Sequence, residues 1–252
     1  MKPLAYTVTA GALTLILAAC SGSVSQDLQP LRDAAQSCGA SAKTTQIAID
    51  ITGSVRGPSL PASYEKAVRD VATHVAACDD RLRVFAFTTS DAATVTLFDR
   101  SFHVPSGTEN GHLRQAQRAA DDATSEVRDA YGKIGTTLAA DATDVVAQFG
   151  QAADWARQQG QGSSELVILT DGFQTVGPQP LTLTAASAAS GAFGRLPDLT
   201  GWNVTVAGLG RSIGYDAPST ITAQLRSFYE SLCQQMHTSS CAALTDYVPR
   251  WS

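Results

Sequence analysis

Hydrophobic residues along the chain follow two spacings, which predict buried β-strands and amphipathic α-helices. Short apolar, β-branched runs lie at residues 45–52, 83–89, 165–170 and 203–209, and they are typical of strands buried on both faces. Residues 94–102 alternate between polar and apolar after a Ser-Asp pair, which predicts an antiparallel hairpin with the second run. The pattern therefore predicts a mostly buried sheet.

Apolar residues spaced three or four apart predict helices between these strands. They fall within residues 64–78, 110–131, 138–156 and 221–236, and a short helix is expected near residues 28–35. Strands that alternate with amphipathic helices indicate an α/β fold, here a three-layer, doubly wound and mostly parallel sheet with one antiparallel edge strand. We find no clear pattern for a further strand after the last helix.

The first residues have the layout of an export signal. Lys2 is followed by an uncharged apolar run over residues 4–19, which ends in Leu-Ala-Ala-Cys before a Ser/Gly segment. A transmembrane anchor is the alternative, but it needs about 20 apolar residues. The Leu-Ala-Ala-Cys sequence resembles the lipobox of bacterial lipoproteins, which implies that residues 1–19 are a signal peptide and that Cys20 carries lipid. Residues 20–43 would then be a lipidated tether and residues 44–252 an extracytoplasmic domain in the cell envelope.

Composition limits the classes of partner. The chain has 252 residues, of which 44% are hydrophobic and 16% charged, and its net charge is −5. This balance excludes a disordered tail. A mildly acidic surface gives no electrostatic basis for binding nucleic acid or anionic lipid headgroups, so residence at the membrane would depend on the acyl chains.

The common enzyme motifs are not present in the sequence. The glycines at 208, 210 and 214 are spaced one residue too widely for a dinucleotide-binding loop, and no phosphate-binding loop is found. No Gly-x-Ser sequence has the closing glycine of a nucleophile elbow. The four histidines lack the spacing of zinc ligands. We therefore expect no enzymatic activity.

One group of oxygen-bearing residues is placed to converge. Asp50, Thr52 and Ser54 alternate where the first predicted strand ends, so their side chains point the same way. Asp171 follows another strand, and the carboxyl ends of parallel strands share one sheet edge. Thr136 lies in a Gly-Thr-Thr loop before a predicted helix and supplies a further hydroxyl, although Thr137 fits the same role. Such hard oxygen ligands suit Mg²⁺, Mn²⁺ or Ca²⁺.

Together these residues resemble the metal-ion-dependent adhesion site of the von Willebrand factor A (vWA) family. The family's Asp-x-Ser/Thr-x-Ser motif corresponds to Asp50, Thr52 and Ser54, its loop threonine to Thr136, and its strand-ending aspartate to Asp171. The resemblance covers residues 44–235 and implies a vWA-like fold. It also implies that Asp171 contacts the metal through water.

A metal held in this way keeps residual positive charge and an open position, which attract an oxyanion. The expected occupant is an Asp or Glu carboxylate of a protein partner, and the loops at residues 56–61, 173–180 and 211–216 would set specificity. Two alternatives stay open at this point. One is a metal-dependent hydrolase, and the other is a structural protein of envelope assembly whose site is not adhesive.

Five cysteines are present, and lipidation of Cys20 leaves an even number. Outside the cytoplasm, such a set is more often bridged than free, although four buried thiols are the alternative if export is wrong. Cys38 and Cys78 precede the first two predicted strands, at the amino ends of neighbouring strands, so a bridge between them is geometrically reasonable. Cys233 and Cys241 would close the last helix onto the chain that follows it.

Overall fold

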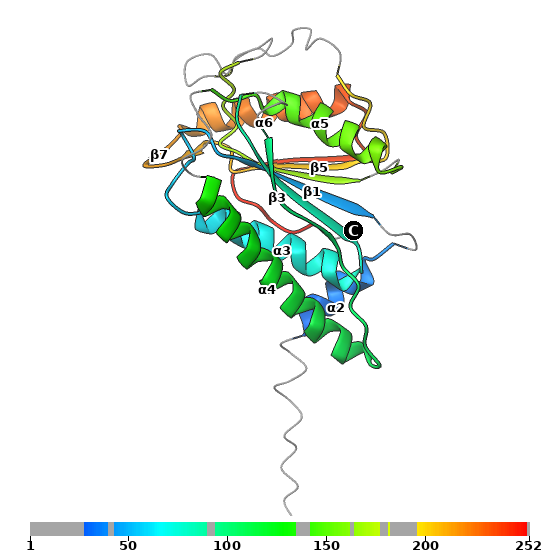
Figure 1. Cartoon of the computed structure of the whole chain (residues 1–252). Helices are drawn as coiled ribbons and strands as arrows, with labels where there is room; N and C mark the ends of the chain where they lie inside the picture. The colour runs from blue at the N-terminus through cyan, green and yellow to red at the C-terminus, as the bar shows by residue number, and fades with distance from the viewer. Residues whose placement is uncertain are drawn as a thin grey trace, which may run out of the picture.

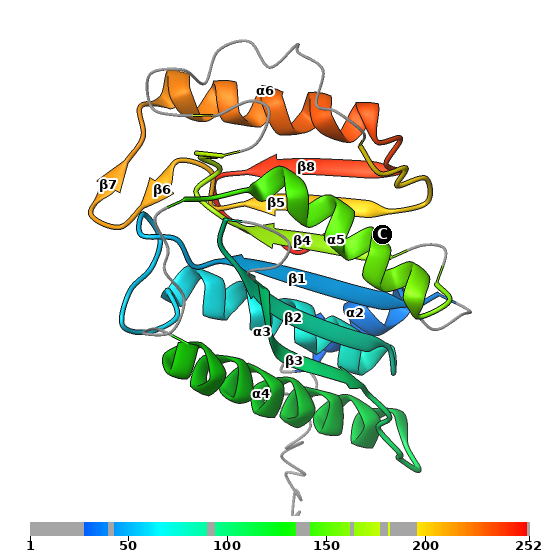
Figure 2. The ribbon, with the colours of Figure 1, turned by 45° about the horizontal axis from the view of Figure 1, so that its top comes forward.

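Six strands form one sheet in the order β3-β2-β1-β4-β5-β8 (Figure 1 and Figure 2). This computed structural model describes residues 28–39, 43–89, 94–134, 142–161, 164–176, 181 and 196–250. The strands are β1 (Thr44–Asp50), β2 (Arg81–Phe87), β3 (Thr94–Ser101), β4 (Glu165–Leu169), β5 (Asn203–Ala207) and β8 (Ser240–Leu244). Only β3 is antiparallel to its neighbour in this sheet. The predicted α/β class and the antiparallel edge strand are confirmed.

Helices cover both faces of the sheet (Figure 1). The helices α2 (Gln29–Gln36), α3 (Ala62–Ala77) and α4 (Glu109–Ile134) lie on one face, and α5 (Val145–Gln158) and α6 (Ser219–Gln235) lie on the other. A small hairpin of β6 (Arg211–Ser212) and β7 (Tyr215–Asp216) follows β5 at the carboxyl edge of the sheet. The arrangement has the three layers that the sequence predicts.

Alternate residues of the buried strands feed two separate cores. On β1, Ile47 and Ile49 pack in the core beneath α3 and α4, whereas Ala48 packs in the core beneath α5 and α6. All seven residues of β1 are buried. Successive side chains of a strand point to opposite faces, so a strand between two helical layers has to be apolar throughout. This explains the continuous apolar runs in the sequence.

Two sequence expectations are wrong. A sixth strand does follow the last helix, because Ser240–Leu244 pairs with β5 in parallel. The helix expected to begin near Leu138 begins instead at Val145, where the Asp144 side chain accepts a hydrogen bond from the Ala147 backbone N–H (3.0 Å). That capping bond satisfies one of the free N–H groups at the helix start and fixes where the helix begins.

The two predicted disulfides are present, with Cα–Cα distances of 5.3 Å for Cys38–Cys78 and 6.1 Å for Cys233–Cys241. The first joins the segment before β1 to the end of α3, and α2 packs on α4 through a small apolar cluster that includes Leu31 and Leu113. Cys20 and the signal segment lie outside the described residues. Within the described part of the chain, no helix is long and apolar enough to span a membrane.

Candidate metal centre

The register of the sheet brings two aspartates to one edge. Ile49 of β1 pairs with Leu169 of β4, so Asp50 and Thr170 emerge at the same level. The Thr170 hydroxyl donates a hydrogen bond to Asp50 Oδ2 (2.7 Å), and Asp171 is the next residue. Asp50, Thr170 and Asp171 are all fully buried. Parallel pairing of two core strands is therefore what assembles the carboxyl groups.

The turn after β1 folds its hydroxyls back onto Asp50. Both the backbone N–H and the hydroxyl of Thr52 donate to Asp50 Oδ1, at 2.9 and 2.7 Å. The Ser54 Oγ lies 3.5 Å from the Thr52 Oγ1. Thr52 is buried whereas Ser54 is exposed, so this row of oxygen atoms runs from the interior to the surface.

Asp171 is held by groups from two loops. Its Oδ1 accepts a hydrogen bond from the Phe173 backbone N–H (3.1 Å), and its Oδ2 accepts one from the Ser212 hydroxyl (2.8 Å). Gly172 follows with a φ of +84°, and a Cβ there would lie 2.5 Å from a methyl carbon of Leu209. The turn after Asp171 thus requires glycine for both its dihedral angle and its close packing.

Burial disfavours negative charge on both aspartates, and the charge of Asp171 adds repulsion at Asp50. Burial, followed by the charge of Asp171, raises the pKa of Asp50 to about 7, although hydrogen bonds from Thr170 and Thr52 oppose the rise. Burial also raises the pKa of Asp171, against hydrogen bonds from Ser54, Ser212 and the Phe173 amide. Burial and these two carboxylates raise the pKa of Tyr64 well above its ordinary value. A cation would relieve this repulsion.

Four of the five predicted ligands, Asp50, Thr52, Ser54 and Asp171, lie together at this edge. Thr136, like its alternative Thr137, lies outside the described residues. Sequence reasoning placed residues 211–216 near the site but did not single out Ser212, which contacts Asp171 directly. No motif marks Ser212, since it lies 41 residues from Asp171 in the sequence.

The donors fit a hard divalent cation. They are two carboxylates and two hydroxyls, all oxygen, as Mg²⁺ and Ca²⁺ require. In the described residues, no group of three or more His, Cys, Asp or Glu side chains offers another site. Fully buried carboxylates are usually paired with a basic group or bound to metal. In the described contacts, no basic side chain hydrogen-bonds to Asp50 or Asp171.

No protein-family model matches the chain, and no curated protein matches it. Among solved structures, the chain is similar to the conserved hypothetical protein BatB from Bacteroides thetaiotaomicron. The TM-score is 0.41 at 16% identity, over 82% of this chain and 92% of that one. It is also similar to a von Willebrand factor type A structure from Catenulispora acidiphila, with a TM-score of 0.43 at 16% identity over 81% of this chain and 39% of that one. The pilus adhesin SpaC from Lactobacillus rhamnosus GG gives a TM-score of 0.41 at 11% identity, over 83% of this chain and 28% of that one. The chain thus spans less than half the length of the last two proteins.

Proposed function

We propose that this chain is a vWA domain that binds a protein partner through a divalent cation. Asp50, Thr52, Ser54 and Asp171 would hold the cation together with Thr136, and an Asp or Glu of the partner would complete its coordination. Mg²⁺ is the expected ion, with Mn²⁺ or Ca²⁺ as substitutes. The domain would act outside the cytoplasm, tethered to the membrane by lipid on Cys20.

The observation that carries this proposal is the pair of buried aspartates at one edge of the sheet. Each accepts hydrogen bonds only from hydroxyl and amide donors in the described contacts, so their charges are not neutralised by a basic side chain. Two such carboxylates are costly in a metal-free protein. With one carboxylate acting through water, a bound divalent ion keeps part of its charge and attracts an anionic group.

Binding fits this site better than hydrolysis. Hydrolysis needs a general base beside the metal-activated water. His74 and His112 hydrogen-bond near the C-terminal end of α3, whereas the aspartates lie beyond its N-terminal end. The described residues at the site supply hydroxyls and two carboxylates that serve as ligands. Among the described residues, the site therefore offers ligands for a cation that would attract an anion, and no side chain placed as a base for hydrolysis.

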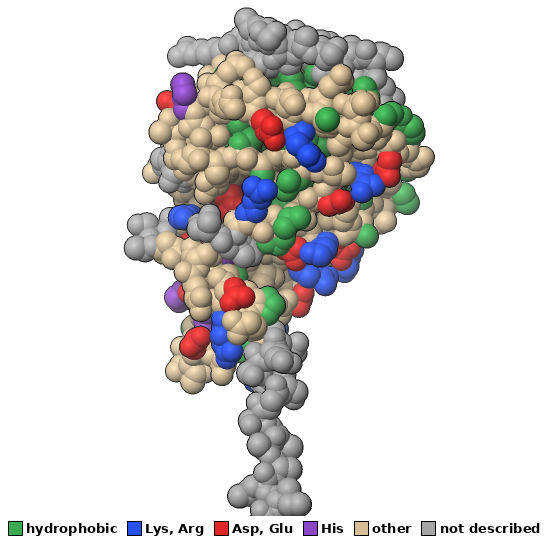
Figure 3. Space-filling view, turned by 180° about the vertical axis from the view of Figure 1, so that it is seen from behind, with side chains coloured by type: hydrophobic (Ala, Val, Ile, Leu, Met, Phe, Trp, Pro, Cys, Tyr) green, Lys and Arg blue, Asp and Glu red, His purple; other side chains and the backbone are tan. Residues whose placement is uncertain are grey.

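The location outside the cytoplasm is supported by the two disulfides, because such bonds persist in oxidising compartments. Nucleic acid is not expected as a partner. The face seen in Figure 3 carries basic and acidic side chains interspersed, without a broad basic patch. Protein remains the partner class that the site and the surface both favour.

Calorimetric titration of the purified protein with MgCl₂ and MnCl₂ tests the metal site. We expect binding in the wild type and in the surface control Asp121→Ala, and loss of binding in Asp50→Asn. Because Asp50→Asn removes a buried charge, it should also raise the melting temperature of the metal-free protein at pH 7.5, by about 2–6 °C for about 1–2 kcal/mol. Unchanged metal binding in Asp50→Asn would refute the site.

Capture of the partner is the second half of the test. Immobilised protein should retain an envelope protein in Mg²⁺ and release it in EDTA, whereas Asp50→Asn should retain it in neither. Retention by both proteins regardless of EDTA would instead favour the structural role, in which the metal is not part of the interface.

A further inference from the structure

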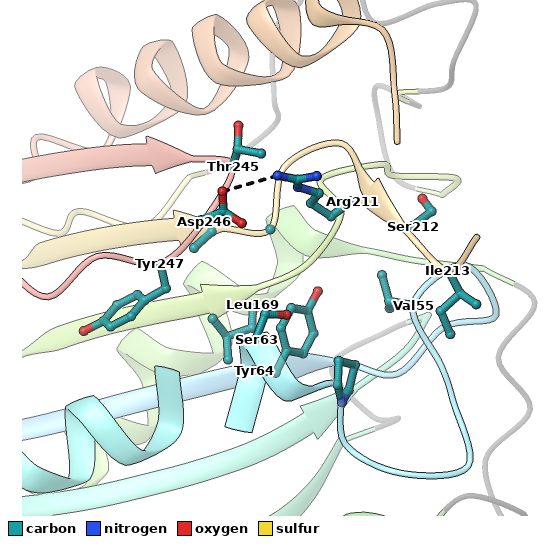
Figure 4. Close-up of a pocket in the computed structure, with 13 residues that line it drawn as sticks. Val55, Ser63, Tyr64, Leu169, Arg211, Ser212, Ile213, Thr245, Asp246 and Tyr247 are labelled. Carbon is teal, nitrogen blue, oxygen red and sulfur yellow. Dashed lines mark hydrogen bonds and ion pairs between the residues drawn. The ribbon is translucent and has the colours of Figure 1, made fainter. Parts of the chain in front are cut away.

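A cavity of about 170 Å³ lies beside the candidate metal centre, between the start of α3 and the β6–β7 hairpin. In Figure 4, Val55, Tyr64 and Leu169 lie below this space, Ile213 lies beside Val55, and Arg211 and Ser212 lie above. The first three side chains are buried and mostly apolar. A dry cavity of about 150 Å³ can hold one benzene ring, so this cavity has the size for one bulky side chain.

The cavity and the metal centre share a wall. Ser212 lines the cavity while its hydroxyl hydrogen-bonds Asp171 Oδ2 (2.8 Å). The next residue, Ile213, donates its backbone N–H to the Ser54 carbonyl oxygen (2.7 Å). Ser212 of β6 and Ile213 in the turn after it are therefore each hydrogen-bonded to a candidate ligand, and both border the cavity.

Tyr64 brings an unsatisfied polar atom to the cavity. Its side chain is 5% exposed, and its hydroxyl has no hydrogen-bond partner among the described residues. A Cβ at Gly208, another lining residue, would lie 3.2 Å from this hydroxyl. Buried hydroxyl groups normally have hydrogen-bond partners, and a buried hydroxyl without one lowers stability. A ligand in the cavity could supply the missing bond.

Apolar surface gathers around the same edge. Among the described residues, three large hydrophobic side chains are exposed, and two of them, Ile213 at 57% and Tyr215 at 47%, belong to the β6–β7 hairpin. Ile213 also lines the cavity. Exposed apolar residues beside a charged site are typical of surfaces that bind other proteins.

From this arrangement we propose that the cavity is a second subsite of the partner-binding surface. It takes a bulky apolar side chain that lies next to the metal-binding acid of the partner, and Tyr64 Oη hydrogen-bonds a polar group of that segment. The proposal rests on the proposed function. The charge of the bound cation selects the acid, and the cavity selects the neighbouring residue, so the preferred partner carries an acidic–apolar pair on an exposed loop.

The cavity is tested first without reference to the metal. Titration with 4-methylphenol, followed by NMR, should shift the backbone amides of Val55, Gly208 and Ile213 in both Mg²⁺ and EDTA. Toluene, which lacks the hydroxyl, should bind to the wild type more weakly than 4-methylphenol does. The two compounds should bind equally well to Tyr64→Phe. Ala207→Leu, which fills the cavity, should abolish both responses. If Ala207→Leu does not fold, Ile213→Ser, at the exposed rim of the cavity, takes its place as the cavity variant.

The link to the metal is tested with capped dipeptides. Ac-Glu-Tyr-NH₂ or Ac-Tyr-Glu-NH₂ should bind about ten-fold more tightly than 4-methylphenol in Mg²⁺, because a short linker gives a high effective concentration. The gain should vanish in EDTA and in Ac-Gln-Tyr-NH₂. Ala207→Leu should retain Mg²⁺ binding by calorimetry but lose this gain.

The outcomes separate the two claims. If 4-methylphenol leaves the cavity amides unshifted, or binds Ala207→Leu as well as the wild type, the subsite is refuted even where Mg²⁺ binds. If Mg²⁺ does not bind while 4-methylphenol does, the proposed function fails. The proposal that the metal and the cavity together bind an acidic–apolar pair then fails as well, although the cavity itself accepts an aromatic ring. Equal binding of the Glu and Gln peptides in Mg²⁺ also overturns the pairing.

Discussion

Asp50 is the residue at which folding and binding oppose each other. Its carboxylate is fully buried, accepts three hydrogen bonds and faces a second acid, and its pKa is raised to about 7. An apolar residue would serve the core better here. Residues that cost stability and still occupy the end of a core strand are usually explained by function rather than by packing.

Metal affinity should rise with pH because of Asp50. Its pKa in the folded protein, about 7, lies above the ordinary value of 3.8, so the folded state holds a proton that Mg²⁺ must displace below about pH 7. Calorimetry at pH 5.5, 6.5, 7.5 and 8.5 should show affinity increasing and then levelling off above pH 7.5. The stability of the metal-free protein should move the opposite way, falling as pH rises from about 4 to 7, because the folded state binds more protons than the unfolded one.

Glu165 provides the matched control for this pH dependence. Burial raises its pKa to about 7 as well, but it stands at the start of β4, at the opposite end of the strand from Asp171. Glu165→Gln should therefore reduce the fall in stability with pH and leave the pH dependence of Mg²⁺ affinity unchanged. A metal affinity that does not change between pH 5.5 and 8.5 would contradict the role of Asp50.

At the level of elements, the sequence predicted what depends on local pattern. Extended alternation predicted that the side chains of Asp50, Thr52 and Ser54 lie together, and they do, but the strand ends at Asp50 and a turn brings the two hydroxyls back to it. Strand β8 was missed because Ser240–Leu244 is short and lacks β-branched residues, so its strand conformation comes from pairing with β5. The start of α5 was misplaced because small residues continue the helical spacing upstream, although Asp144 offered a capping signal.

Ser212 could not be predicted because only the folded hairpin brings it to Asp171. Its hydroxyl orients the carboxylate, and groups that orient a metal ligand commonly contribute 10–100-fold in metal affinity. Ser212→Ala should therefore weaken Mg²⁺ binding by about ten-fold, with a change in the free energy of unfolding of no more than about 1 kcal/mol. Calorimetry and urea unfolding measure the two quantities.

The control for Ser212→Ala is Ser63→Ala. Ser63 lines the same cavity and is exposed, but it makes no hydrogen bond to either aspartate in the described contacts. Its replacement should leave Mg²⁺ affinity within about two-fold of the wild type. Should the two variants bind Mg²⁺ equally, the hairpin would have no part in holding Asp171.

Across the whole molecule, the Cys38–Cys78 disulfide and the candidate metal centre occupy opposite ends of the strands. Cys78 ends α3 just before β2 begins, and Cys38 comes just before β1, so their disulfide lies at the amino-terminal ends. Asp50 and Asp171 lie beyond the carboxyl-terminal ends of β1 and β4. If lipid on Cys20 tethers the chain as proposed, entry at α2 would hold the domain at the amino-terminal ends of the strands, with the candidate metal centre at the opposite ends.

This separation predicts that the disulfides stabilise the domain without tuning the metal site. Cys38–Cys78 spans 40 residues and Cys233–Cys241 spans 8, so loop-closure entropy assigns about 4 and about 2.5 kcal/mol to them. Urea unfolding of Cys38→Ala/Cys78→Ala should show the larger loss of stability, and that of Cys233→Ala/Cys241→Ala the smaller. Under native conditions both variants should bind Mg²⁺ as the wild type does. Loss of Mg²⁺ binding in the folded Cys38→Ala/Cys78→Ala protein would show instead that this disulfide affects the candidate metal centre. The effect would pass along α3, which ends just before Cys78 and carries Tyr64 in its first turn.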